Sequence, residues 1–320
     1  MIKKKAYAKL NLSLDVTGKR DNGYHDIKTL MVMTSLYDEL NFSKSDKVEI
    51  EGDSPFDFDI KENYIYKSYE VLRDFVGYDL PFKVKIIKNI PMAAGLAGGT
   101  SNGAETFYAL KDLYDLKIPT DELIKLASKL GADFTYMMTS GTKIASGIGD
   151  ILEDAQKVEL ENVLIVNPGY GVSTKDVYKN IKIDDKRIDF DKVLYALKDL
   201  EIKKLNAVLE NKMEKVVFKD HKDLLEIKNK MIEFNSASLM SGSGASVFGI
   251  FENKDELEEA YKYFKNIYPK SFKVKVGEEF GSFWHRTWHS FPLWSEKGLF
   301  KLLCGQWIWV LRPIQERCHK

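Results

Sequence analysis

The chain has 320 residues, with 48 basic and 48 acidic side chains and therefore no net formal charge. This balance provides no basic field for nucleic acid or for an anionic membrane surface, so we expect neither as a partner. A hydrophobic fraction of 44% is typical of a globular protein, and the length allows one large or two ordinary domains. No signal peptide and no 18-residue apolar run is visible, so we expect a cytoplasmic protein.

The composition changes abruptly after Phe280. All five tryptophans and both cysteines lie beyond it, and residues 1–280 hold 42 basic and 46 acidic side chains. A body without cysteine fits a reducing compartment. We interpret residues 281–320 as a non-native tail, introduced by cloning or by a shifted reading frame. The alternative is an amphipathic segment that lies on a membrane or partner surface.

The first predicted elements are two strands. Leu10, Leu12 and Leu14 alternate with polar residues, which predicts a strand with Lys9 and Asn11 together on its other face. A turn at 21–23 and a second strand over 29–34 follow. Taken alone, Lys9 is also explained as a solvated strand lysine, and His25, between the strands, as a surface loop histidine.

A helix is predicted over 65–75, with an apolar stripe that includes Phe75, and a strand over 82–90. A glycine-rich loop and another helix come next. Thr120 then predicts the N-cap of a helix that ends at Gly131, which places Asp133 in the turn beyond it.

The second half of the chain is predicted to contain both strands and helices. Strands are predicted over 142–145 and 163–166, helices over 188–200 and 203–217, and then a helix, strand, helix and strand over 224–234, 246–251, 255–264 and 272–276. The polar connection 156–162 suggests a domain boundary. The pattern predicts an α+β protein.

The glycine-rich loop follows a strand and opens a helix, which is an arrangement that binds phosphate through backbone N–H groups and the helix dipole. Thr100 and Ser101 can cap the helix, contact a phosphate or coordinate Mg²⁺. The simpler alternative is a tight turn with an N-cap. The loop matches neither GxxxxGK[ST] nor GxGxxG. It consists of Pro91, Met92, Ala93, Ala94, Gly95, Leu96, Ala97, Gly98, Gly99, Thr100 and Ser101.

This loop resembles the ATP-binding motif of the GHMP kinase superfamily, and motifs at residues 8–12 and 240–248 agree in order and place. The resemblance runs from about Lys5 to Phe280. It implies ATP with Mg²⁺, whose protein ligands stay unknown, and a two-domain α+β fold. An N-terminal ATP-binding domain of the ribosomal-protein-S5-domain-2-like type would occupy 1–155, and a C-terminal ferredoxin-like domain 156–280.

Within the superfamily, Gly23-Tyr24-His25 and Leu130-Gly131-Ala132-Asp133 resemble the kinases of 4-diphosphocytidyl-2-C-methyl-D-erythritol, which act in non-mevalonate isoprenoid synthesis. That likeness implies transfer of the ATP γ-phosphoryl group to the 2-hydroxyl of the acceptor. It also implies that Asp133 is the base and that Lys9 holds the hydroxyl. Without it, Asp133 is a turn aspartate that accepts local N–H groups.

The resemblance further implies two sets of binding residues. Tyr24 and His25 would bind cytosine, with Tyr178 as a second stacking ring, because an aromatic face stacks on a base and imidazole pairs with its edge. The remaining substrate candidates are Asn11, Thr174, Ser243 and Gly244, and the candidates for adenine are Asn63, Lys67 and Lys88.

The chain departs from the family pattern at two places. Phe134-Thr135 replaces a common Val-Pro, which we expect to loosen the turn that carries Asp133. Asn102 stands where many relatives carry Asp, which removes one possible carboxylate near Mg²⁺. Two alternatives stay open: another GHMP kinase, for mevalonate or homoserine, or a GHMP-fold ligand-binding protein without turnover. The oligomeric state is also open.

Overall fold

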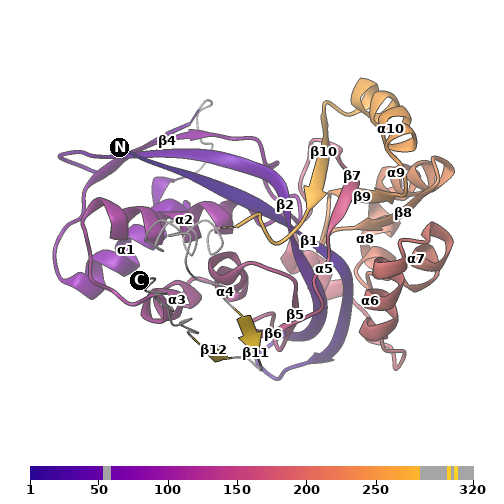
Figure 1. Ribbon diagram of the computed structural model, residues 1–320, viewed down its shortest axis with the longest axis horizontal. Helices are drawn as coiled ribbons and strands as arrows, with labels where there is room; N and C mark the ends of the chain where they lie inside the picture. The colour runs from indigo at the N-terminus through magenta and orange to yellow at the C-terminus, as the bar shows by residue number, and fades with distance from the viewer. Residues whose placement is uncertain (53–58, 282–300, 304–305, 309–320) are drawn as a thin grey trace, which may run out of the picture. The chain divides into compact units, whose positions relative to one another are not determined.

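A computed structural model describes residues 1–52, 59–281, 301–303 and 306–308. Two compact units are present, Met1–Trp284 and His285–Lys320. In the second unit, β11 (Lys301–Leu303) pairs antiparallel with β12 (Gln306–Ile308) (Figure 1). Most of the predicted tail, 281–320, lies outside the described residues, and its origin stays a prediction.

The larger unit is built on two long antiparallel strands, β1 (Ile2–Lys19) and β2 (His25–Lys44) (Figure 1). Successive parts of β2 also pair with three other strands. The main sheet has the order β3-β4-β2-β10-β7-β9-β8; β1 and β5 also pair with β2, and β6 pairs with β5. The other strands are β3 (Glu49–Gly52), β4 (Phe82–Ile87), β5 (Lys143–Ser146), β6 (Ile151–Asp154), β7 (Leu160–Asn167), β8 (Ser236–Met240), β9 (Val247–Phe251) and β10 (Lys270–Val276).

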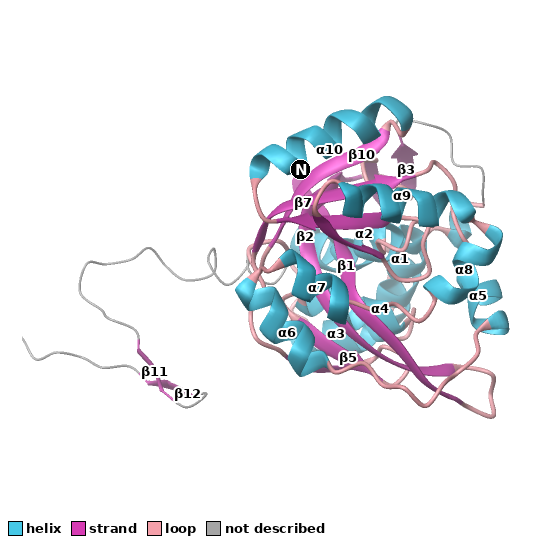
Figure 2. Ribbon diagram, turned by 90° about the vertical axis from the view of Figure 1, so that its right-hand side faces the viewer, coloured by secondary structure: helices cyan, strands magenta, loops and turns pink. Residues whose placement is uncertain are grey.

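Helices pack on this sheet in both halves of the unit, and Figure 2 shows those of the C-terminal half in front. In the N-terminal half, α2 packs on β1 and β2, whereas in the C-terminal half α9 packs on β8 and β9, and α10 on β7 and β10. The N-terminal set is η1 (Ile60–Glu62), α1 (Tyr64–Val76), α2 (Gly98–Leu113), α3 (Thr120–Ser128) and α4 (Ala132–Thr139). The C-terminal set is α5 (Thr174–Asn180), α6 (Phe190–Asp199), α7 (Ile202–Val208), α8 (Glu214–Asp220), α9 (Lys222–Glu233) and α10 (Lys254–Ile267).

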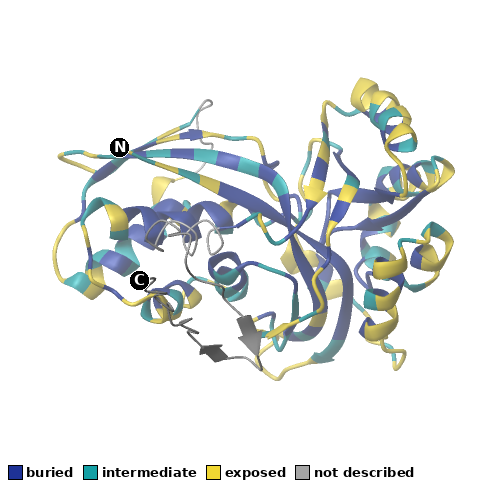
Figure 3. Ribbon diagram, in the orientation of Figure 1, coloured by how far each residue is buried: buried dark blue, intermediate teal, exposed yellow. Residues whose placement is uncertain are grey.

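Burial is continuous along the middle of β1, where every residue from Ala6 to Val16 is buried (Figure 3). One apolar core lies between β1, β2, β4 and helices α1 to α4, and it includes Phe82 and Phe107. Two others fill the C-terminal half. The leucines of β1 belong to these C-terminal cores, so this N-terminal strand holds the two halves of the unit together.

The predicted α+β class is confirmed. The predicted helix over 203–217 is wrong, because the structure has α7 and α8 separated by residues 209–213. That segment runs beside β1, where the N–H of Leu14 donates to Glu210 O (3.0 Å) and the N–H of Lys212 to Leu14 O (2.9 Å). Thr120 is the first residue of α3 and Pro119 its N-cap, and Phe75 is 47% exposed, so neither has its predicted place. The sequence also gave no sign of β3, β6, β8 and α5. The domain boundary at 155/156 stays a prediction.

The segment between α7 and α8 is fixed by one amide, which makes a testable contribution to stability. Asn211 is 2% exposed; its Nδ2 donates to Met240 O (2.7 Å) and Gly242 O (2.8 Å), and its Oδ1 accepts from the N–H of Met213 (2.9 Å). Asn211→Ala leaves these buried groups unpaired, and we expect a loss of about 1–3 kcal/mol in the free energy of unfolding.

Urea unfolding of the variant measures this loss. Asn180→Ala is the matched control, because Asn180 is exposed and donates only to Asp176 O (2.9 Å). Equal losses in the two variants would contradict the prediction.

Candidate active site

One large cleft, of about 730 Å³, lies in the larger unit. Its wall combines the glycine loop 91–101 with β1, β2, the start of α4, the segment that leads into α5, and the turn between β8 and β9. The predicted site residues that line it are Lys9, Asn11, Asn63, Lys88, Pro91, Met92, Ala93, Ala94, Gly95, Ala97, Gly98, Gly99, Thr100, Asp133, Thr174, Tyr178 and Ser243.

The glycine loop ends at an open helix N-terminus. Helix α2 begins at Gly98, and its N-cap, Ala97, has a left-handed backbone with φ of 55° and offers no side-chain cap. Thr100 and Ser101 therefore lie inside the first turn, and the prediction that they cap the helix is wrong. No side chain caps the first N–H groups of this 16-residue helix, so these groups are available to an anion in the cleft.

The two glycine motifs pack directly against each other. Gly95 has φ of +74°, and a Cβ there would lie 2.1 Å from Ser241 O, so only glycine fits. The Ser241 hydroxyl donates to Gly95 O (3.0 Å), and the N–H of Ser246 donates to Ala94 O (3.1 Å). The turn that contains Ser243 and Gly244 thus closes over the loop.

Lys9 and Asn11 lie side by side on β1 and face the cleft. They are 5% and 4% exposed, and the Lys9 ammonium donates to Asn11 Oδ1. The register of β1 against β2 shifts just before Lys9 and just after Asn11, and such irregularities redirect side chains. The N–H of Lys9 donates to Leu96 O (3.1 Å), which ties this strand to the glycine loop. A solvated lysine is therefore excluded.

Asp133 lies in the first turn of α4 and not in a turn beyond a helix, which corrects the predicted local structure. Burial lowers the pKa of Lys9, and the charge of Asp133 raises it, so the two groups are within electrostatic reach. The Tyr178 ring also lines this region, and burial together with Asp133 raises its pKa to about 12.

Phe134 anchors the helix that carries Asp133. It is 1% exposed, it packs edge-on against Tyr64 with ring centroids 5.3 Å apart, and a Cβ at Gly103 would lie 2.8 Å from its ring. A buried aromatic ring thus holds the start of α4, and the expected loosening through Thr135 in the place of the family's proline stays a prediction.

The aromatic residues are only partly brought together. His25 is 8% exposed, so it is not a surface residue, and it stacks on Tyr178 with centroids 5.1 Å apart and planes at 19°. Burial lowers the pKa of His25, which favours neutral imidazole. Tyr24 is 60% exposed and, like His25, does not belong to the described lining of the cleft.

The hydroxyls of Thr174 and Ser243 lie 2.7 Å apart.

The adenine candidates also divide. Asn63 lines the cleft as the N-cap of α1, whereas Lys67 pairs with Glu62 (2.6 Å) and does not line it in the part of the chain described. Lys88 lines the cleft and is held by Asp38 (2.7 Å).

Sequence reasoning missed Asp38, although it orders the entrance to the glycine loop. It is 0% exposed and accepts from the N–H groups of Asn89 and Ile90, both at 2.8 Å, as well as from Lys88. The alternation along β2 could have indicated this burial, because Leu36, Asp38 and Leu40 are two residues apart and share one face of the strand. Both leucines are buried.

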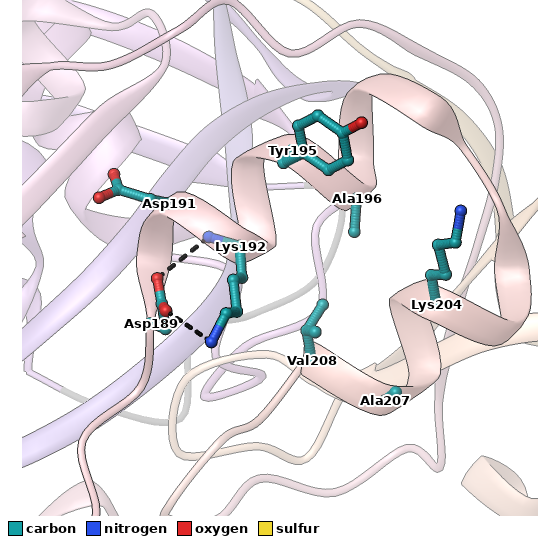
Figure 4. Close-up of a pocket in the computed structure, with 8 residues that line it drawn as sticks. All are labelled: Asp189, Asp191, Lys192, Tyr195, Ala196, Lys204, Ala207 and Val208. Carbon is teal, nitrogen blue, oxygen red and sulfur yellow. Dashed lines mark hydrogen bonds and ion pairs between the residues drawn. The ribbon is translucent and has the colours of Figure 1, made fainter.

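A second hollow, of about 580 Å³, lies between α6 and α7 (Figure 4). Asp189 accepts from the backbone N–H of Lys192 (3.1 Å) and pairs with its side chain (3.1 Å), so its carboxylate is occupied as a helix cap. The lining is completed by Asp191, Tyr195, Ala196, Lys204, Ala207 and Val208. The helix N-terminus at this hollow is capped and its lysine–aspartate pair is exposed, unlike the uncapped helix and the buried Lys9 of the cleft.

Within the described ranges, no three His, Cys, Asp or Glu side chains gather in a way that would hold a metal ion. The helices of that part of the chain are all too short or too polar to cross a membrane.

Comparison with known proteins decides the family. The profile of the GHMP kinases N terminal domain matches residues 63–150, and that of the GHMP kinases C terminal matches 194–270. A 4-diphosphocytidyl-2-C-methyl-D-erythritol kinase of Clostridium kluyveri is 38% identical over 276 residues, which are 85% of this chain and 99% of the relative. One from Clostridium novyi is 36% identical over 82% of this chain and 96% of the relative.

The chain belongs to the 4-diphosphocytidyl-2-C-methyl-D-erythritol kinase family of GHMP kinases. A crystal structure of a 4-(cytidine 5'-diphospho)-2C-methyl-D-erythritol kinase has a TM-score of 0.75 and 27% identity, and the match covers 86% of this chain and 99% of that one. The protein is therefore an ATP-dependent small-molecule kinase.

The burial of Lys9 predicts a pH-dependent stability. Burial lowers the pKa of folded Lys9 from its ordinary value of 10.5. As pH rises from the folded pKa toward 10.5, the folded state releases a proton that the unfolded state keeps. We expect the free energy of unfolding of the wild type, relative to Lys9→Met, to rise over that window.

Urea unfolding between pH 7 and 10.5 measures this difference. Lys275→Met is the control, because the Glu161 carboxylate raises the pKa of Lys275, and its contribution should stay constant up to pH 10.5. A wild-type advantage over Lys9→Met that falls with pH would contradict the burial of a charged Lys9.

Proposed function

We propose that this kinase transfers the γ-phosphoryl group of ATP to the 2-hydroxyl of 4-diphosphocytidyl-2-C-methyl-D-erythritol, in the cytoplasm and within non-mevalonate isoprenoid synthesis. The observation that carries the proposal is a buried lysine, Lys9, paired electrostatically with Asp133 in the same cleft as the uncapped N-terminus of α2. The names of the relatives supply the acceptor.

The phosphates of ATP bind at the glycine loop. Backbone N–H groups of the first turn of α2 donate to the phosphate oxygens, and the helix dipole favours their charge. Gly95 and Gly98 allow the loop to pack in this shape, since a Cβ would lie 2.1 Å from Ser241 O at Gly95 and 2.8 Å from the Ile90 side chain at Gly98. Asn63 and Lys88 lie on the nucleotide side of the cleft, whereas Lys67 has only the weaker support of its position on α1.

Lys9 and Asp133 act on the acceptor hydroxyl. The hydroxyl oxygen attacks the γ-phosphorus, the bond from that phosphorus to the oxygen of ADP breaks, and the hydroxyl proton passes to the Asp133 carboxylate. Lys9 donates to the attacking oxygen and to the charge that develops on the transferred group. Asn11 holds Lys9 from the side.

The cytosine binds near the ring of Tyr178, against which His25 already stacks. Aromatic stacking and an imidazole edge suit a nucleobase, and mevalonate and homoserine offer no base to such a site. Tyr24, exposed at the edge, would reach the base only after binding, while Thr174, Ser243 and Gly244 face the remainder of the acceptor. This aromatic set favours the cytidyl acceptor over the other GHMP substrates.

The residues near the phosphates fit Mg²⁺. Among the described residues, the Oδ1 of Asn102 is buried and has no hydrogen-bond partner, and Asn102 lines the cleft together with Thr100. Mg²⁺ takes few protein oxygens beside phosphates and water, so Thr100, Ser101 and Asn102 would suffice to hold it. When bound, it shields the phosphate charge during transfer.

Replacement of the proposed base should abolish most turnover. Asp133→Asn keeps the shape of the side chain but cannot accept the hydroxyl proton, so we expect kcat to fall by about 10²–10⁴-fold. Release of ADP with the cytidyl acceptor is the measurement. Asp121→Asn is the control, because Asp121 is exposed in the first turn of α3. An unchanged kcat in Asp133→Asn would refute the assignment of the base.

The acceptor specificity should depend on Tyr178. Tyr178→Ala removes stacking of about 1–3 kcal/mol, so we expect KM for the cytidyl acceptor to rise by about 10–100-fold with KM for ATP unchanged. Tyr178→Phe keeps the ring and should behave as the wild type.

Tyr195→Ala serves as the control, since Tyr195 is 65% exposed beside the second hollow. Mevalonate and homoserine are assayed in parallel. Turnover of either of them in place of the cytidyl acceptor would exclude the proposed substrate, and ATP binding without any turnover would favour a binding protein.

A further inference from the structure

Thr29, on β2, is a buried residue of the cleft to which nothing above gives a role. It is 1% exposed and lines the cleft beside Asn11. Its hydroxyl donates to Ser13 O, with the two oxygens 2.7 Å apart, and lies 2.8 Å from the Nδ2 of Asn11. Asn11 in turn holds the ammonium of Lys9.

The hydrogen-bond chemistry of this chain allows one orientation. A threonine hydroxyl has one proton, and the carbonyl of Ser13 can only accept, so Thr29 gives its proton there. Toward Asn11 the hydroxyl must therefore accept, and it requires the NH₂ end of the amide. The carbonyl end, Oδ1, is then left for Lys9, which can only donate.

We propose that Thr29 is a positioning residue for phosphoryl transfer, because it fixes the Asn11 amide so that its oxygen holds Lys9 at the acceptor hydroxyl. The inference rests on the proposed role of Lys9. A flipped amide would point NH₂ at the ammonium, and two donors would face each other. Lys9 would then leave its place beside the reacting atoms.

The surroundings leave little room for another arrangement. A Cβ at Gly242 would lie 3.2 Å from Asn11 Oδ1 and 3.4 Å from Lys9 Nζ, so the turn between β8 and β9 closes one side with neutral backbone. From α4, Asp133 is the charged group that acts on Lys9. Asn11 from β1 is thus the neutral acceptor that completes the environment of the ammonium.

Thr29→Val tests the proposal because it keeps the shape and removes the hydroxyl. We expect kcat with the cytidyl acceptor to fall by about 10²-fold, as for a misplaced catalytic group, with KM for ATP unchanged. Thr29→Ser restores the hydroxyl and should restore kcat.

Thr34→Val is the matched control. Thr34 lies on the same strand, is 0% exposed, donates to Ala8 O (3.2 Å) and accepts from the N–H of Leu36 (3.3 Å). It does not line the cleft in the described part of the chain. It should lose comparable stability and keep kcat.

Two further readouts separate positioning from stability. NMR titration of the Lys9 ε-carbon should show a lower pKa in Thr29→Val, because the ammonium loses its amide acceptor. In an Asn11→Ala background, Thr29→Val should have no further effect on kcat, since Thr29 acts through that amide.

Several results would overturn the proposal: a folded Thr29→Val with unchanged kcat and Lys9 pKa, an equal loss of kcat in Thr34→Val, or a full effect that persists without Asn11. If Thr29→Val does not fold, Thr29→Cys carries the same expectation, because a thiol is a weak acceptor. If the wild type does not turn over the cytidyl acceptor, the proposed function fails, and the Lys9 titration still decides the orientation of the amide.

Discussion

The polar face of β1 is buried, and the rest of the structure depends on the hydrogen bonds that pair these buried polar groups. Lys9, Asn11, Ser13 and Asp15 are all 5% exposed or less, and polar groups removed from water are costly unless they are paired. Lys9 donates to Asn11 on the same strand, and the other three have partners in other segments: Asn11 in Thr29, Ser13 in the N–H of Glu210 (3.4 Å), and Asp15 in the N–H of Ile188 (3.0 Å). The polar face of the strand that carries Lys9 is thus fully paired only when the C-terminal half has packed onto it, because the partners of Ser13 and Asp15 lie there.

The glycine loop also depends on contacts with distant segments of the chain. Its shape is fixed by Gly95 against Ser241, residues 146 positions apart in the chain, and by the N–H of Val172, which donates to Ala93 O (3.3 Å). Three segments therefore meet at one loop whose own side chains are too small to define it. A glycine loop between a strand and a helix gives the chemistry of anion binding, but the backbone of remote turns sets where the anion lies.

This dependence explains what could be predicted from the sequence. Local spacing indicated the glycine loop and the shared strand face of Lys9 and Asn11, whereas Asp133 and Tyr178 came from the resemblance to the family. The structure brings all of them to one cleft. Alternation along β1 separated two faces, yet it could not show that the polar face is covered. The break between α7 and α8, the buried Asp38 and the role of Thr29 all follow from partners far away in the chain, and periodicity carries no record of such partners. The packing of Phe134 is a further case, because its contacts with Tyr64 and Gly103 depend on segments far from it in the chain.

The charge of the buried Lys9 ammonium depends on the same packing. A buried ammonium is favoured only by what surrounds it, and here burial lowers its pKa while Asp133 offsets part of that effect. The Oδ1 of the neutral Asn11 amide also stabilises the buried ammonium, and it can do so only while the amide keeps this orientation. Phosphates that enter the same cleft add negative charge close to the ammonium, so substrate binding favours the charged lysine that the empty cleft supports least. With the role proposed for Lys9, the cleft is a cation site that its own substrate completes, and the hydrogen bond to Asn11 holds the ammonium before the substrate binds.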